Sequence, residues 1–105
     1  MLPAMPTSPS FRLHLHLLPV GRRLDFSVRA GLFADIYRRC NQGNWQCLAY
    51  NAHSPFVDHA PLAPDALPEY RIRYRNALGQ LTATSPIQQV HPVGLPAGPS
   101  WISLR

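Results

Sequence analysis

The sequence predicts an all-β fold, a two-sheet antiparallel sandwich of about seven strands. First, apolar and polar residues alternate with a period of two over several short segments, which is the pattern of strands with one buried face. Second, turn residues separate these segments at a spacing of about 8–12 residues. Third, twelve prolines in 105 residues, without an apolar stripe of helical period, argue against long helices. The length fits one domain.

The N-terminal half supplies four of the strands. Residues 1–10 have no periodicity and three prolines, so we expect a Pro-rich N-terminal arm there. Residues 11–18 alternate strictly, and after the turn "PVGRR" the alternation resumes over residues 23–30. Residues 32–40 and 45–52 flank "NQGN", which is a strong hairpin signal.

The geometry of this hairpin decides the state of the two cysteines. A two-residue "GN" turn would place Cys40 opposite Cys47, on the same face as Ile36 and Trp45, and would allow a cross-strand disulfide. A four-residue loop would instead pair Cys40 with Trp45 and leave two thiols that pack as small apolar groups. A disulfide would indicate an oxidising setting, outside the cell or in a virion.

The C-terminal half supplies three further strands. A short strand over residues 54–58 leads through a Pro/Ala-rich crossover into a strand over residues 68–75, "PEYRIRYR". The turn "NALGQ" then leads into a last strand over residues 81–90, whose internal proline restricts part of it to an edge or a bulge. Residues 92–105 are expected to form a Pro/Gly-rich C-terminal arm, so the sandwich domain spans residues 11–91.

Alternation within "PEYRIRYR" separates apolar from basic side chains. Successive strand residues point to opposite faces of a sheet. The sequence therefore predicts core positions at Tyr70, Ile72 and Tyr74, beside Ile36 of the neighbouring strand. It predicts an outer face that carries Arg71, Arg73, Arg75 and Tyr37. This outer face is either solvated or a contact surface for a protein, and nucleic acid is disfavoured because single-strand binders need several exposed aromatic rings.

The motifs "DIYRRCNQGNWQCLAY", "SPFVDHAPL" and "EYRIRYRNALGQLTATSPI" resemble a fibronectin type III module of the bacterial kind. The resemblance covers about residues 24–91. It implies two sheets, A-B-E and C-C′-F-G, with residues 68–75 as strand F. It also implies that Tyr70 is a corner tyrosine whose hydroxyl bonds to the backbone near the crossover. In such modules Asp58 would hold the following loop by capping backbone N–H groups.

No catalytic arrangement stands out, so we expect no enzyme activity and no cofactor. The five carboxylates accompany no nucleophile motif, and neither cysteine has a histidine partner implied by the sequence. His14 and His16 share a strand face, but no further ligands can be placed beside them, so we expect no metal site. The N-terminus lacks the basic start of a secretory signal, and no segment predicts membrane insertion.

The two arms shape the functional expectation. They are apolar, and Trp101, Ile102 and Leu104 would form an exposed cluster on a monomer. We therefore expect a structural subunit that associates with copies of itself or other proteins through its arms and strand edges, in a filament, virion or surface assembly. The alternative is a monomeric accessory module that binds carbohydrate or peptide through Trp45, Tyr37 and Tyr50. An arginine-rich nucleic-acid binder is the weaker alternative, since a net charge of +5 permits an anionic partner.

Overall fold

The computed structural model describes residues 11–90. Both predicted arms, including Trp101, Ile102 and Leu104, lie outside the described residues. Within residues 11–90 the chain forms strands and no helix, as the alternation predicts. The eight strands are β1 (Leu13–Leu18), β2 (Gly21–Phe26), β3 (Phe33–Cys40), β4 (Gln46–Ala49), β5 (Phe56–Asp58), β6 (Pro68–Arg75), β7 (Leu81–Thr84) and β8 (Gln88–Gln89). None of this part of the chain could span a membrane as an apolar helix.

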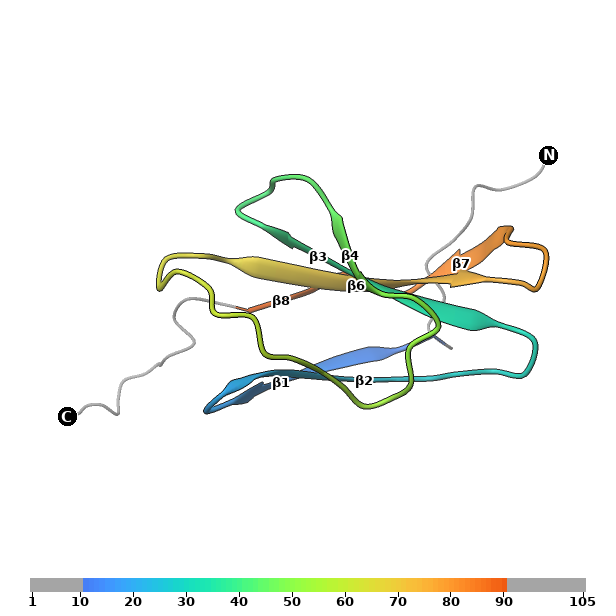
Figure 1. Cartoon of the computed structure of the whole chain (residues 1–105), viewed down its shortest axis with the longest axis horizontal. Coiled ribbons are helices and arrows are strands. Elements are labelled where there is room, and N and C mark those ends of the chain that lie inside the picture. The colour runs from blue at the N-terminus through green and yellow to red at the C-terminus, as the bar shows by residue number, and fades with distance from the viewer. Residues whose placement is uncertain (1–10, 91–105) are drawn as a thin grey trace.

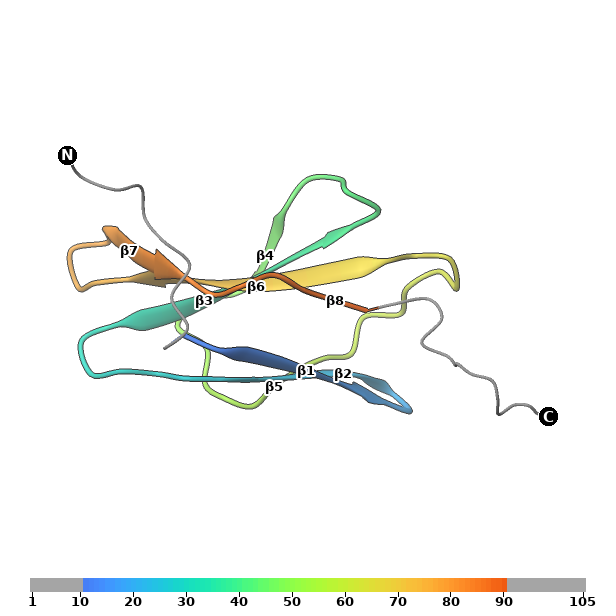
Figure 2. The ribbon, with the colours of Figure 1, turned by 180° about the vertical axis from the view of Figure 1, so that it is seen from behind.

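The strands form two antiparallel sheets that face each other as layers (Figure 1). The smaller sheet has the order β1-β2-β5. The larger sheet has the order β4-β3-β6-β7, and β8 also pairs with β6. Seen from behind, the same two layers face each other (Figure 2). The predicted two-sheet antiparallel sandwich is therefore confirmed.

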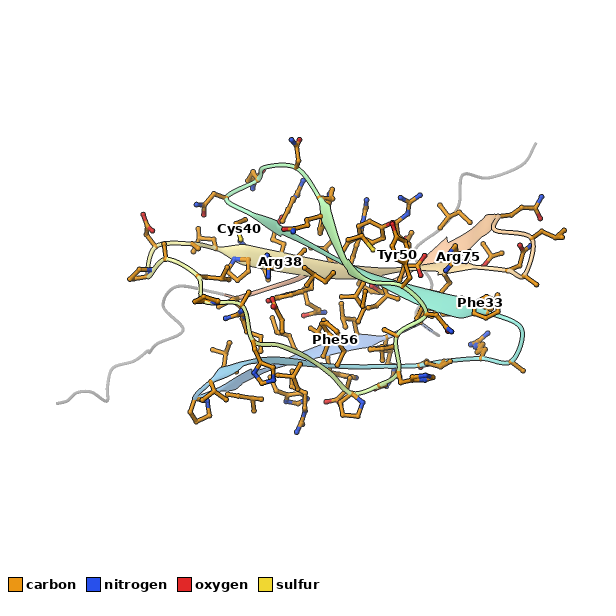
Figure 3. All side chains as sticks on the ribbon, viewed as in Figure 1. Phe33, Arg38, Cys40, Tyr50, Phe56 and Arg75 are labelled. Atoms are coloured by element: carbon orange, nitrogen blue, oxygen red, sulfur yellow. The ribbon has the colours of Figure 1, made fainter. Side chains whose placement is uncertain are left out.

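The core lies between the layers and follows the period-two pattern. On β6, Tyr70, Ile72 and Tyr74 are fully buried, and Ile36 of β3 pairs directly with Ile72. The smaller sheet contributes Leu24, which is also fully buried. Figure 3 shows the ring of Phe56 in the space between the layers, where it packs against this cluster. Burial of each such large apolar side chain contributes about 1.5–3 kcal/mol.

The predicted last strand is divided at Pro86. Proline has no N–H to donate to a strand ladder, and the chain leaves the regular pattern between β7 and β8. Ser85 bridges the gap, because its N–H donates to Ile72 O (2.9 Å) and its Oγ accepts from Ile72 N–H (2.8 Å). Both halves therefore stay attached to β6.

The hairpin between β3 and β4 differs from both predicted geometries. Its register pairs Tyr37 with Cys47, with a bulge next to this pair, and the left-handed turn positions are Asn41 and Gln42. Cys47 thus lies three residues away from Cys40 along β3, roughly 10 Å by strand rise, and alternation places the two thiols on opposite faces. The cross-strand opposition of Cys40 and Cys47 is therefore not formed, and both cysteines are free thiols in this structure, as in the alternative given above.

Candidate functional site

The outer face of the larger sheet gathers four of the ten arginines. On β6 the side chains of Arg71, Arg73 and Arg75 point away from the core, as predicted, because the residues between them are buried. On β3 the pairing register sets Tyr37 beside Arg71 and Asp35 beside Arg73. The labelled Tyr50 and Arg75 mark this side of the sheet in Figure 3. The cluster that results is called here the arginine–aromatic face, and its members are Phe33, Asp35, Tyr37, Arg39, Trp45, Glu69, Arg71, Arg73 and Arg75.

Guanidinium groups stack on three aromatic rings of this face. Arg39 and Arg71 lie over the ring of Trp45, at 4.6 and 4.5 Å from its centroid. Arg73 lies 5.5 Å from the centroid of Tyr37, and Arg75 lies 5.6 Å from that of Phe33. Each such contact contributes about 0.5–1 kcal/mol at a solvated site. The stacking also fixes the direction in which each guanidinium presents its N–H groups.

The position of Trp45 corrects a sequence prediction. Trp45 was expected on the core face beside Ile36, but it lies on the outer face, because the wider loop and the bulge change its register. Phe33 was not predicted as a member of the face. The alternation that places Tyr37 outward also places Phe33 outward, so the position of Phe33 could have been predicted from the sequence. The face on which Trp45 lies depends instead on the geometry of the loop.

Two of the four arginines on this face are neutralised by buried carboxylates. Arg75 binds Asp35 in a bidentate manner, with Nε–Oδ2 and Nη2–Oδ1 distances of 2.5 and 3.1 Å. Its hydrogen bond to Asp35 raises the pKa of the Arg75 guanidinium. Arg39 donates to Glu69, which is 7% exposed. Both carboxylates are therefore occupied by partners on their own face.

Arg71 and Arg73 have no such partner. Neither guanidinium makes a hydrogen bond or ion pair with another described residue, and Arg71 Nε is a buried donor without an acceptor. Burial, followed by the charges of Arg73 and Arg39, lowers the pKa of Arg71. Since a guanidinium remains protonated in proteins, the face keeps two uncompensated positive charges.

A small cavity of about 160 Å³ opens on the same face between Arg73, Tyr37 and Tyr50. The ring of Tyr50 is 69% exposed, whereas Tyr37 and Trp45 are half-buried under guanidinium groups. Of the three aromatic residues expected to bind carbohydrate, only Tyr50 therefore offers an open ring. A sugar platform built from all three is not formed here.

A second polar cluster is buried between the layers around Asp58. Its Oδ2 accepts from Tyr70 Oη (2.6 Å) and Arg38 Nη1 (2.7 Å), and Arg22 Nη2 lies 3.3 Å away. Its Oδ1 accepts from Ala60 N–H (3.1 Å), which caps the following loop. The Tyr70 hydroxyl also accepts from Arg22 Nε (2.7 Å). Tyr70 is therefore bonded to two ionised side chains, and not to the crossover backbone as the resemblance implies.

Electrostatics keep this cluster in one charge state. Burial opposes ionisation of Asp58, but the hydrogen bonds from Tyr70, Arg38 and Ala60 outweigh it, and the pKa of Asp58 is lowered. Burial and the bond to Asp58 raise the pKa of the Tyr70 hydroxyl. At neutral pH the carboxylate is ionised and the phenol is protonated. This arrangement holds the two sheets together and presents no reactive group to solvent.

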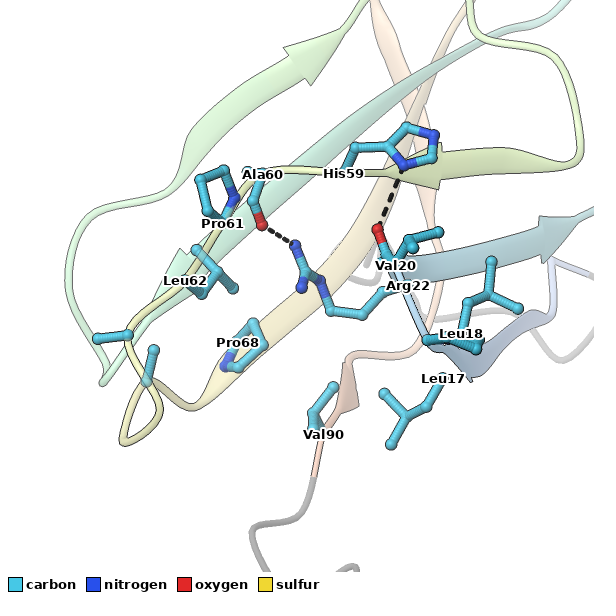
Figure 4. Close-up of a pocket in the computed structure, with 14 residues that line it drawn as sticks. Leu17, Leu18, Val20, Arg22, His59, Ala60, Pro61, Leu62, Pro68 and Val90 are labelled. Atoms are coloured by element: carbon cyan, nitrogen blue, oxygen red, sulfur yellow. Dashed lines mark hydrogen bonds between the residues drawn. The ribbon is translucent and has the colours of Figure 1, made fainter.

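A groove of about 490 Å³ opens at one end of the sandwich. Figure 4 shows it between the β1–β2 turn, the crossover after β5 and the end of the described chain at Val90. Arg22 donates to Ala60 O at 2.7 Å on one wall. Leu17 and Val20 are 61% and 69% exposed at its rim, so this groove presents apolar surface to solvent.

The histidines form no metal site in the described part of the chain. His16 Nε2 lies 2.9 Å from Asp25 Oδ2 on the neighbouring strand. No group of three or more metal-ligating side chains occurs among residues 11–90. The fold and these surfaces define an all-β sandwich with an arginine–aromatic face and an apolar groove. Comparisons with protein families, with curated proteins and with solved structures found no match to this chain.

Proposed function

We propose that this chain is a non-catalytic structural subunit with a fibronectin type III-like fold. It associates with copies of itself or with other proteins through its arms and strand edges, in a filament, a virion or a surface assembly. The strand orders β1-β2-β5 and β4-β3-β6-β7 support the fold, since they correspond to the A-B-E and C′-C-F-G sheets of such modules.

The observation that carries the proposal is the apolar groove beside the edge strand β1. In the described sheet β1 pairs with β2 on one side only, so its other edge offers unpaired backbone groups. At the end of this strand Leu17 is exposed at the rim of the groove, next to Val20. Exposed apolar surface beside an open strand edge is typical of protein interaction sites.

The occupation of the carboxylates supports a non-catalytic role. Asp35 and Asp58 are almost fully buried and hydrogen-bonded to arginines, and Glu69 is bonded to Arg39. Asp25 binds Arg23 of its own strand and His16 of the neighbouring strand β1. A general acid or base must reach a substrate proton, and these four carboxylates are held by their own arginine and histidine partners.

The groove is tested with Leu17→Lys and the matched control Leu78→Lys. Both leucines are exposed, at 61% and 83%, but Leu78 lies in the β6–β7 turn, away from the groove. We expect the natural chain to form oligomers in size-exclusion chromatography with light scattering. Leu17→Lys should shift the population toward the 11.8 kDa monomer, and Leu78→Lys should not. A natural chain that stays monomeric at every concentration would contradict the proposal.

The arms are tested by removing residues 1–10 and 92–105 together. Since residues 11–90 contain both sheets and the core, the shortened chain should keep its β-type circular dichroism spectrum. We expect it to remain monomeric. Assembly equal to that of the full chain would show that the arms are not needed.

A further inference from the structure

The arginine–aromatic face holds positive charge that nothing in the described chain neutralises. Arg39 and Arg75 are paired with Glu69 and Asp35, whereas Arg71 and Arg73 are not paired. Each guanidinium carries five N–H donors in a planar fork, which suits bidentate binding of a carboxylate. The adjacent guanidinium groups of Arg71 and Arg73 therefore have N–H donors that are available to bind a carboxylate.

We propose that Arg71 and Arg73 bind an acidic, extended segment of a partner protein, with carboxylates at alternate residues. The two arginines are themselves alternate residues of β6, so their Cα atoms lie roughly 6.6–6.8 Å apart along the strand. Alternate side chains of an extended peptide have the same spacing. A peptide lying along β6 therefore places one carboxylate against each guanidinium.

Stacking prepares the two arginines for this contact. The ring of Trp45 lies against Arg71, and the ring of Tyr37 lies against Arg73. Part of the rotamer freedom that an arginine loses on binding is therefore already lost in the free protein, which reduces the entropic cost of association. The adjacent cavity of about 160 Å³, bounded by Arg73 and Tyr50, leaves room for a side chain of the partner.

The partner is a different protein, because a second copy of this chain lacks the necessary carboxylates. Asp25, Asp35, Asp58 and Glu69 are all paired with residues of their own chain. Asp65 is the remaining acidic side chain, and it lies alone in the crossover loop. Two copies would therefore set the arginine–aromatic faces against each other with like charge, which is unfavourable.

Protein is favoured over nucleic acid by the state of the rings. Single-stranded nucleic acids bind proteins mainly by stacking bases on open aromatic side chains. Phe33, Tyr37 and Trp45 are half-buried, and each is stacked against a guanidinium of its own chain. The face thus offers N–H donors for carboxylates and little open ring surface for bases.

The test uses the full chain and a short fluorescein-labelled peptide with glutamate at every second position. A matched peptide carries glutamine at those positions. Binding is measured by fluorescence anisotropy at low ionic strength. We expect Arg71→Gln and Arg73→Gln each to weaken binding of the glutamate peptide by about 10-fold or more, since a hydrogen-bonded charge is removed. Arg71→Lys should recover binding only in part, because lysine lacks the fork.

The control is Arg12→Gln, which removes the same charge from an exposed arginine that precedes β1 in the smaller sheet. It should change the affinity by less than about twofold, as expected for a charge that makes no direct contact. The β-type circular dichroism spectrum verifies folding, and if Arg71→Gln fails to fold, Arg73→Gln decides the result.

The proposal would be overturned if Arg12→Gln weakened binding as much as Arg71→Gln and Arg73→Gln do. It would also be overturned if the glutamine peptide bound as tightly as the glutamate peptide. A third contrary result would be displacement of the labelled peptide by single-stranded DNA or heparin at a lower concentration of negative charge than unlabelled glutamate peptide requires. Assembly in the proposed function depends on Leu17 and the arms, so the two proposals fail independently.

Discussion

Tyr70→Phe tests the interpretation of the buried cluster. The substitution keeps the ring in a fully buried site and removes one oxygen atom. That oxygen donates to Asp58 Oδ2 and accepts from Arg22 Nε, at 2.6 and 2.7 Å. Hydrogen bonds to charged groups contribute about 1.5–3 kcal/mol each. Asp58 keeps Arg38 and the backbone N–H of Ala60, so the two losses do not add fully. We expect Tyr70→Phe to lower the free energy of unfolding by about 2–3 kcal/mol.

Tyr74→Phe is the matched control. Tyr74 is equally buried on the same strand, but its hydroxyl donates to the neutral carbonyl of Ser27 at 2.6 Å. This bond contributes about 1 kcal/mol. Urea unfolding followed by circular dichroism should show a midpoint roughly 1–2 M lower for Tyr70→Phe, with an unchanged m-value. A loss for Tyr70→Phe no larger than that for Tyr74→Phe would refute the assignment of ionic partners to Tyr70.

Three further predictions concern stability and thiol chemistry. Burial raises the pKa of Tyr74 to about 12 from 10.0, so the stability that the protonated phenol contributes is complete below pH 10 and is lost as the pH rises toward 12; urea midpoints between these pH values should fall less steeply in Tyr74→Phe. Gly21→Ala should destabilise the fold by about 1–3 kcal/mol, because a Cβ there would lie 2.6 Å from the carbonyl oxygen of Asp58; an unchanged thermal midpoint would contradict this packing. Alkylation of the unfolded, non-reduced chain should modify both Cys40 and Cys47 in mass spectra, since both thiols are free, and a mass two hydrogens lower with no alkylation would show a disulfide.

Sequence patterns predicted the layers because side-chain alternation follows directly from strand geometry. Tyr70, Ile72 and Tyr74 on one side, and Arg71 and Arg73 on the other, occupy the faces that a period of two requires. The break in the last strand was also predictable, because a proline cannot complete a ladder. The alternation and the break at the proline both depend only on residues that are close together in the sequence.

The contents of the outer face were harder to predict because they depend on register. Trp45 reaches Arg71 only because the β3–β4 loop turns at Asn41 and Gln42, and not at the following glycine. A shift of one residue moves every side chain to the other face of the sheet. The same shift separates the two cysteines. The geometry of this one loop therefore explains both the outward position of Trp45 and the separation of Cys40 from Cys47.

The partners of Asp58 come from elements far apart in the chain. Arg22 lies on β2, Arg38 on β3 and Tyr70 on β6, and no local pattern connects them. The alternation even places Arg38 on the inner face, where an arginine is unexpected without a buried anion. An inward-pointing arginine and a buried carboxylate are each a signal that the other exists, but only the fold shows that they meet.

The cluster around Asp58 also constrains how the sequence can change over evolutionary time. Loss of Asp58 leaves the charges of Arg22 and Arg38 without their buried partner, at a cost of about 3–5 kcal/mol, whereas joint replacement of the cluster by apolar residues of similar volume is close to neutral. Arg22, Arg38, Asp58 and Tyr70 are therefore expected to be inherited as a unit. Among relatives of this chain, the four positions should be retained together or exchanged together for apolar residues.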